Sequence, residues 1–453
     1  MASITLFIFA IFALVAFIYY KKDIIGPWFL LCAMMTLSFV IVLLNTENWE
    51  VVIVPKFTIY CSVMILSWFF GSVAIRFFSG FRISLSHNHV SREIKETQIK
   101  SNISEGTYPY LLLLCISVIL TFFYLKMKLP TFSFSSIEAI KNTLRVIYDT
   151  EKTRGFFRTQ IFQLIIAIAY ISLYKRMSIQ YLSHDRRMRL MLDIPVVLFL
   201  LCALVSTDRN ILLRFMIYFT ILFVMFFREQ IKAHITKKLF VRVIILVLIA
   251  GGVFFSFGAA KQYTSNVTRA ISIYGGSGLY SFNLWLKDFS GPYTHGKFVF
   301  AEVQNVLNAL HLMSRSTVEP NAEFITYYSE NGYVYSSNIY SAMRFYVQDF
   351  GIWGIIVSSI LIGALYEIMY IMMKRRPYGF SWVFYASMIY PVIYYPIVDQ
   401  FMKRMHFGRV YEIGWLVVFY FILFSAYGIS KYRIARRNVV CNRTRRRLVL
   451  RHR

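Results

Sequence analysis

Cysteine is scarce and scattered in this chain. Its 453 residues include five cysteines, and no two of them form a C-x-x-C pair. Neither a zinc site nor a redox motif nor a secreted disulfide scaffold is therefore indicated. Charge is also scarce: 16% of the residues are charged, against about 25% in an average water-soluble domain. Negative charge is the scarcer of the two signs: the chain has 22 Asp and Glu and 49 Lys and Arg, for a formal net charge of +27.

Hydrophobic residues make up 58% of the chain, and its mean hydropathy is +0.56. A nucleic-acid-binding protein would explain the basic character but not this hydrophobicity, so a polytopic membrane protein remains. A spanning helix needs about 20 mostly apolar residues. Eleven runs of this kind predict an all-α protein of about 11 transmembrane helices: 3–20, 24–44, 57–79, 108–125, 157–174, 190–206, 210–227, 240–258, 350–373, 381–399 and 414–430.

The distribution of basic residues predicts the orientation. Segments on the cytoplasmic side of a membrane are enriched in Lys and Arg. Placing the N-terminus outside and the C-terminus in the cytoplasm puts 30 of the 49 basic residues, but only 8 of the 22 acids, on the inner side. The inner segments are 21–23, 80–107, 175–189, 228–239, 374–380 and the tail 431–453. The densest basic cluster, in that tail, is expected to lie on anionic membrane lipid.

Two of the predicted outer segments are long. Residues 126–156 include apolar positions at helical spacing and predict an amphipathic surface helix. Residues 259–349 form one large outer loop, and a loop of that length is usually functional. The expected organisation is therefore an N-terminal bundle over 1–258, the large loop over 259–349 with the active-site residues, C-terminal helices over 350–430 and a basic tail over 431–453.

Several common catalytic signals are missing. The chain has no phosphate-cradling G-x-x-x-x-G-K-[ST] loop, no H-E-x-x-H and no G-x-S-x-G. Residues 275–278, Gly-Gly-Ser-Gly, are interpreted as a flexible turn. The outer histidines and carboxylates show neither a metal triad nor a D-x-D pair, so no metal and no cofactor is predicted. A transferase acting outside the cytoplasm would use a lipid-linked diphosphate donor, whose leaving group needs cationic partners such as arginine.

The outer arginines are therefore the candidate diphosphate ligands. Arg209 lies in a hairpin of a few residues between two spans, and Arg344 lies five residues before Asp349 at the entry to the ninth predicted span. Arg269 and Arg315 lie in the large loop. For each, the alternative is a structural charge that reaches the interface or pairs with an acid.

Two candidates could act on an acceptor hydroxyl. Asp349 could orient or deprotonate it, or it could simply satisfy N–H groups at a helix N-terminus. His311 could act as a general base near neutral pH, or be structural. The aromatics of the large loop suit either sugar stacking or a membrane interface. Asp193 and Glu367, within predicted spans near the inner side, are expected to have a Lys or Arg partner or to reach the interface.

One stretch resembles a bacterial family. Residues 338–351, from Asn338 and Tyr340 to Asp349-Phe350-Gly351, with Gly354 following, resemble the N-x-Y-[TS]…D-F-G-x-x-G pattern of Wzy-type O-antigen polymerases. Residues 23–27 look like that family's D-x-x-x-P step into the second span. Residues 206–209 are similar to its short S/T-G-x-R hairpin, with Asp208 in place of a small residue.

The resemblance implies a GT-C-like helical fold in the bacterial inner membrane. Such enzymes join undecaprenyl-diphosphate-linked oligosaccharide repeat units into O-antigen or capsular polysaccharide at the periplasmic face, by metal-independent glycosyl transfer. It makes Arg209, Asn338, Tyr340, Arg344 and Asp349 the site candidates, whereas His311, Arg269 and Arg315 rest on position and chemistry alone. The partners implied are the lipid-linked glycans, membrane lipids and a chain-length regulator protein, with no nucleic acid.

Other classes share this layout. A repeat-unit flippase or other transporter would also be basic and polytopic, but it is expected to show paired helical halves, which this sequence lacks. An O-antigen ligase, which transfers finished chains to lipid A core, fits the same pattern of spans. A membrane acyltransferase and a structural assembly protein are further alternatives.

Overall fold

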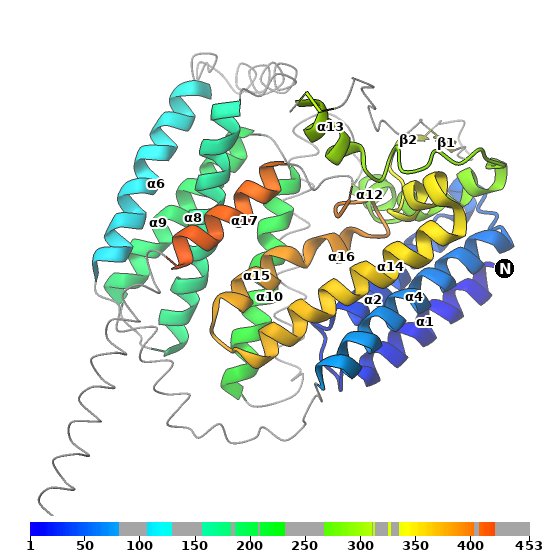
Figure 1. The fold of residues 1–453 in the computed structure, drawn as a ribbon, viewed down its shortest axis with the longest axis horizontal. Coiled ribbons are helices and arrows are strands. Elements are labelled where there is room, and N and C mark those ends of the chain that lie inside the picture. Colours follow the sequence, from blue (N-terminus) through cyan, green and yellow to red (C-terminus); the bar gives the residue numbers. More distant parts are fainter. Residues whose placement is uncertain are drawn as a thin grey trace, which may run out of the picture. The chain divides into compact units, whose positions relative to one another are not determined.

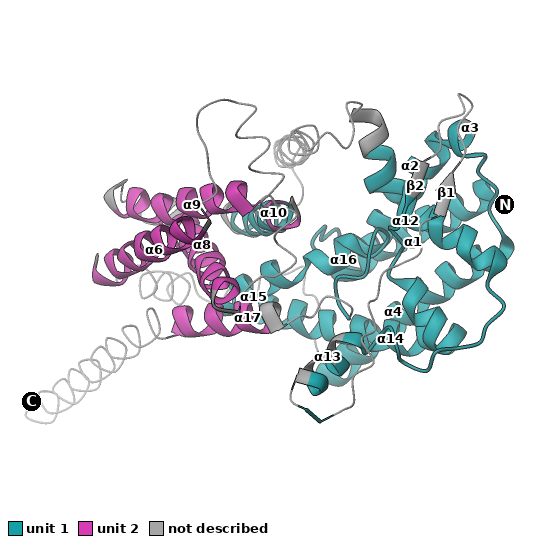
Figure 2. Cartoon of the chain, turned by 90° about the horizontal axis from the view of Figure 1, so that it is seen from above, with its two compact units in different colours: residues 1–85, 213–409 teal, residues 86–212, 410–453 magenta. Residues whose placement is uncertain are grey.

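The structure is a computed structural model that describes residues 1–80, 107–128, 156–182, 186–206, 209–231, 267–309, 311–312, 325–327, 335–402 and 407–421. The chain forms two compact units: residues 1–85 with 213–409, and residues 86–212 with 410–453 (Figure 2). The first unit is the larger one. It takes in helices from the predicted N-terminal bundle and from the predicted C-terminal part of the chain.

The first unit contains α1 (Ala2–Tyr19), α2 (Pro27–Leu44), α3 (Thr46–Trp49), α4 (Pro55–Ser79), most of α10 (Arg209–Ile231), α12 (Val267–Asp288), α13 (Ala301–Ala309), α14 (Met343–Arg375), α15 (Phe380–Met388) and α16 (Tyr390–Tyr394). It also holds a two-stranded antiparallel sheet, β1 (Ile325–Tyr327) with β2 (Tyr335–Ser337). The second unit contains α6 (Thr107–Lys128), α8 (Phe156–Leu182), α9 (Arg186–Ser206) and most of α17 (Phe407–Tyr420). Helices thus dominate both units (Figure 1).

Eight of the described helices are long and apolar enough to cross a membrane: α1, α2, α4, α6, α8, α9, α10 and α14. Each coincides with a run predicted from the sequence. Pro27 and Pro55 stand at the first positions of α2 and α4, where a missing N–H costs nothing. The chain is therefore a helical protein with at least eight candidate membrane spans. The predicted run 240–258 and the predicted surface helix within 126–156 lie outside the described residues, apart from the ends of α6 and α8.

The tenth predicted span is wrong as a single helix. Instead of running through 381–399, the chain forms α15 and the short α16, and residues 395–402 are not helical. Proline explains the break, because it lacks a backbone N–H and clashes with the preceding turn. Pro391 opens α16 and Pro396 follows its end. The eleventh run, 414–430, is represented by α17, which begins earlier, at Phe407.

The region predicted as one large loop contains a 22-residue helix, α12, so Gly275–Gly278 are helical and not a flexible turn. Polar side chains lower the hydropathy of α12, yet several are buried. Ser272 donates a hydrogen bond to the Asn45 side chain at 2.9 Å. Asn283 accepts one from the Val54 amide at 3.0 Å and donates one to the Val52 carbonyl at 2.8 Å. The helix also packs on α2 and α4, and these polar side chains hold it against the segment around α3.

Helix α14 is the central element of the first unit and runs beside α4 (Figure 1). Small residues allow the two backbones to approach closely: Gly71 lies against the Ile360 carbonyl, and Gly363 lies against Trp68. The helix starts at Met343, seven residues before the predicted span, and is interrupted at Gly351. Its two ends, called here the Arg344 end and the Asp23 end after the residues found there, carry the polar groups of the unit.

Segments that the charge pattern assigns to the same side of the membrane lie at the same end of this unit. At the Asp23 end, Asp23 contacts Arg228 and Lys374, and Arg375 donates a hydrogen bond to the Ser79 carbonyl at 3.0 Å. These residues belong to, or adjoin, four segments predicted to be inner. At the other end, Lys56 contacts the Phe289 carbonyl. The structure thus brings together the segments that the charge pattern assigns to one side.

Candidate functional site

Arg344 is the centre of the candidate site. It is the second residue of α14, and only 3% of it is exposed. Its guanidinium carbon lies 3.9 Å from the centroid of the Tyr340 ring and 5.3 Å from that of Trp285. Such contacts attract the cation to the ring face and fix its position. Two residues singled out in the sequence, Arg344 and Tyr340, are thereby joined to Trp285 of α12, which the sequence indicated only as one of many loop aromatics.

Trp285 belongs to a row of aromatic rings, the aromatic ladder, formed by Phe282, Trp285, Phe289 and Tyr293. Neighbouring centroids lie 6.2, 4.2 and 6.2 Å apart along this order. Phe282 is buried, whereas Tyr293 is 48% exposed, so the ladder leads from the core to the surface. Lys56, at the start of α4, donates a hydrogen bond to the Phe289 carbonyl at 3.3 Å. The site thus combines ring faces with two cations.

Asp349 holds a short segment, the strap (residues 291–300), against α14. Its carboxylate accepts hydrogen bonds from the Thr294 hydroxyl and from the backbone amides of Phe298, at 3.0 Å, and Val299, at 2.6 Å. Backbone bonds run alongside, from the Thr294 amide to the Gln348 carbonyl and from the His295 amide to the Asp349 carbonyl, both at 3.1 Å. Asp349 is completely buried.

The interpretation of Asp349 as a cap of its own helix is therefore wrong, because the N–H groups that donate hydrogen bonds to its carboxylate belong to the strap. The residue lies inside α14, two positions before the interruption at Gly351. Gly351 has φ 63° and ψ −145°, a backbone conformation that residues other than glycine rarely adopt. A Cβ there would also meet the Tyr293 hydroxyl at 2.8 Å. The Asp-Phe-Gly stretch thus joins strap and helix.

The non-helical segment 395–402 supports the chain around Tyr340 and Arg344. The Tyr395 carbonyl accepts hydrogen bonds from the Ala342 amide at 3.0 Å and the Ser341 hydroxyl at 3.2 Å. Asp399 is buried and accepts from the amides of Phe401 and Met402 and from the Tyr346 hydroxyl at 3.4 Å. Sequence reasoning missed this acid because it assigned the segment to a continuous span. The two prolines were the available signal.

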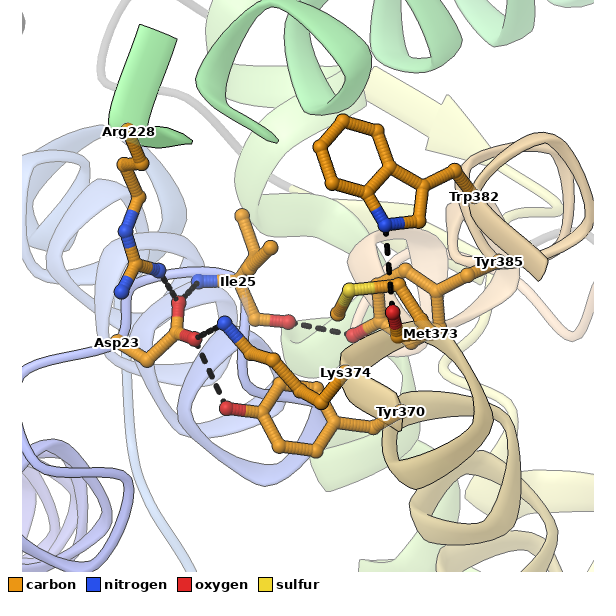
Figure 3. Close-up of polar contacts among 8 residues, drawn as sticks. All are labelled: Asp23, Ile25, Arg228, Tyr370, Met373, Lys374, Trp382 and Tyr385. Atoms are coloured by element: carbon orange, nitrogen blue, oxygen red, sulfur yellow. Dashed lines mark hydrogen bonds and ion pairs between the residues drawn. The ribbon is translucent and has the colours of Figure 1, made fainter. Parts of the chain in front are cut away.

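At the opposite end of α14, Asp23 binds two cations (Figure 3). Its carboxylate pairs with Arg228 and, at 2.5 Å, with the Lys374 ammonium, and it accepts a hydrogen bond from the Tyr370 hydroxyl at 2.8 Å. Burial raises the pKa of Asp23, but Lys374 and Arg228 outweigh that effect and lower the pKa from 3.8 to about 2. The α1–α2 turn is thus tied to α10 and α14 by charge.

Both intramembrane acids noted in the sequence have an arginine partner, as expected. Glu367 is fully buried; it pairs with the Arg76 guanidinium at 2.5 Å and accepts a hydrogen bond from Tyr20 at 2.6 Å. In the second unit, Asp193 pairs with Arg176 at 2.9 Å. These pairs connect α4 with α14 and α8 with α9.

The other sequence candidates do not join the Arg344 cluster in what the structure describes. His311 is exposed on a turn after α13, with φ 58°, and Asn338 is exposed just after β2. Arg209 begins α10 and Arg269 lies in α12, but their side chains are outside the described part, as is the whole of Arg315. Within the described ranges, no three His, Cys, Asp or Glu side chains are grouped to hold a metal.

Comparison with known proteins adds no family to this description. A scan of protein-family models, a search of curated proteins and a search of solved structures each found no match to the chain.

Proposed function

We propose that this protein polymerises lipid-diphosphate-linked oligosaccharide repeat units, as O-antigen polymerases do, in a bacterial inner membrane. The observation that carries the proposal is the convergence of the motif residues at one end of α14. Tyr340 and Arg344 form one contact cluster, and Asp349 and Gly351 contact the strap that borders it. A motif that resembles a family pattern thus has a defined three-dimensional arrangement.

Arg344 is proposed to bind the diphosphate leaving group. An arginine guanidinium is planar and always charged, and it matches phosphate oxygens through paired N–H donors. The rings of Tyr340 and Trp285 hold this guanidinium, so little conformational entropy would be lost when an anion binds. Arg209, Arg269 and Arg315 stay predictions as further ligands, and so does Asn338 as a contact to the donor.

The aromatic ladder is proposed to bind sugar rings, whose apolar faces stack on aromatic side chains. Its exposed end, at Tyr293, lies beyond the Arg344 cluster. His311, exposed after α13, stays a prediction as the general base for the acceptor hydroxyl. In this proposal the Arg344 end faces the periplasm, and the Asp23 end, with its surplus of cations, faces the cytoplasm.

The test is complementation of a strain that lacks the encoding gene, with gel analysis of its surface polysaccharide. Loss of the protein should leave one repeat unit on lipid A core. A core without any repeat unit would indicate a ligase or a flippase instead. R344A and R209A should reproduce the deletion pattern at normal protein level in the membrane.

A matched control is R376A, because Arg376 is exposed at the other end of α14. This variant should restore the full ladder of chain lengths. Normal ladders from both R344A and R209A would sink the assignment of these arginines to the diphosphate.

A further inference from the structure

We infer that Asp349 is a positioning residue, which latches the strap to α14 and so sets the geometry of the Arg344 cluster. Its expected effect on chain elongation rests on the proposed function, but the latch itself can be tested without it.

The bonds of the Asp349 carboxylate define this role. A carboxylate offers about four acceptor positions, and here three donors occupy most of them: the Thr294 hydroxyl and the amides of Phe298 and Val299. The Phe298 amide lies 3.3 Å from one carboxylate oxygen and 3.0 Å from the other. No part of Asp349 is exposed. A general base must instead approach the acceptor hydroxyl to hydrogen-bond distance.

The strap is shaped to present its amides to this one carboxylate. His295 and Gly296 both have positive φ, 48° and 90°, and reverse the chain after Thr294. The next turn places the consecutive amides of Phe298 and Val299 on the same carboxylate. Successive N–H groups that converge in this way form an anion-binding concavity. The carboxylate of Asp349 occupies the concavity and stabilises the turn.

The latch reaches Arg344 from two directions. On one side Phe289, two residues before the strap, stacks on Trp285, which lies beside Arg344. On the other side Phe298 of the strap packs against Phe345, the neighbour of Arg344 in α14, with ring centroids 5.9 Å apart. Releasing the strap would therefore loosen both the stacked ring and the first turn of the helix.

Cysteine accessibility tests the latch directly. Val299 is 6% exposed, so V299C in the otherwise native full-length protein should react slowly with a membrane-impermeant maleimide. Adding D349A should increase the labelling rate at least fivefold, and adding T294V, which removes one of the three donors, should give a smaller increase. The parent without V299C sets the background, and K297C, at an exposed position, reports the rate of an accessible thiol.

Neutralising a nearby exposed acid shows whether the loss of any negative charge in this region would release the strap. Asp288 is exposed at the end of α12, close to the strap in sequence, so D288N should leave V299C protected. Slow labelling of V299C in both D349A and T294V would overturn the inference. Fast labelling in D288N as well would overturn it too, because the strap would then open without loss of the latch.

D349N distinguishes positioning from catalysis. Asparagine keeps an acceptor oxygen for the strap but cannot accept a proton as a base, and loss of a general base costs about 10²–10⁴-fold in rate. The inference expects elongation in D349N within about tenfold of the parent. A D349N protein that keeps V299C protected but loses at least a hundredfold in rate overturns it. If the strain that lacks the protein still makes a normal ladder while D349A exposes V299C, the proposed function fails and the latch stands.

Discussion

The Arg344 guanidinium lies 3.9 Å from the centroid of the Tyr340 ring, and both residues are almost completely buried. Tyr340 precedes α14 and Arg344 lies in its first turn, so this contact joins the non-helical segment after β2 to the helix. The ring face attracts the cation whether or not the ring carries a hydroxyl.

The first prediction separates the ring of Tyr340 from its hydroxyl. Y340F keeps the face beneath Arg344 and should elongate polysaccharide at close to the parental level. Y340L removes the cation–π contact, which contributes about 0.5–2 kcal/mol, and should reduce elongation roughly threefold or more. Gel densitometry of chain length, normalised to the amount of membrane protein, measures both. Equal activity of Y340L and the parent would show that the ring does not hold Arg344 in place.

The second prediction concerns Gly351. G351A must adopt a positive φ and must also displace the Tyr293 hydroxyl, so the cost should be about 1–3 kcal/mol. G80A, at φ 59° and ψ 17° with open space around it, should show only the smaller cost of the left-handed helical conformation, which other residues do adopt. G414A, in α17 with open space and without a positive φ, should be neutral or slightly stabilising. Thermal unfolding in detergent should therefore rank the stabilities as G414A, then G80A, then G351A.

A result in which G351A matches G80A would mean that neither the close approach of Tyr293 nor the ψ of −145° at Gly351 adds a cost. The junction of strap and helix would then depend on the Asp349 bonds alone.

Hydropathy predicted the spanning helices well because length and apolarity decide whether a segment can cross a membrane. Runs such as 3–20 and 57–79 correspond to α1 and α4. Hydropathy missed α12, whose polar residues are buried against partners elsewhere in the chain. Helix α12 hides Ser272 and Asn283 against the segment around α3, and no window of local sequence contains those partners.

The candidate site was predictable only in part, for a similar reason. The motif pointed to Tyr340, Arg344 and Asp349 together, and the structure gathers them at one end of α14. Nothing in the local sequence indicated that Trp285 lies beside Arg344, or that Asp349 faces Phe298 and Val299, because these contacts link residues about 50 or more positions apart. The structure supplied this long-range pairing.

The third prediction concerns acid. The pKa of Asp23 is lowered from 3.8 to about 2 in the folded protein, so its charged form stabilises the fold above pH 4. That contribution is lost as the pH falls from about 4 to about 2, and it amounts to about 2 kcal/mol. The parent and D23N should therefore differ in thermal midpoint by a constant amount from pH 5 to 7, and the difference should shrink as the pH falls from about 4 to about 2. A difference that stays constant down to pH 2.5 would contradict this.

The fourth prediction tests the charge cluster around Asp23 at neutral pH. D23N leaves the Lys374 ammonium and the Arg228 guanidinium without their shared carboxylate, so it should cost about the 2 kcal/mol that the charge of Asp23 contributes at neutral pH. Y370F removes only the hydrogen bond to Asp23, which contributes about 1 kcal/mol. Unfolding of the purified protein in mixed micelles with increasing SDS measures both losses of stability.

The double variant D23N/K374M decides whether the pair acts as a unit. K374M alone removes one of the two cations that contact Asp23 and leaves Arg228 as its partner. Since D23N and K374M interrupt the same 2.5 Å contact, the cost of the double variant should fall short of the sum of the single costs by about 1–3 kcal/mol. Strict additivity would show that Lys374 and Asp23 lie close together without stabilising one another, and the attachment of the α1–α2 turn to α14 would then depend on Tyr370 and Arg228.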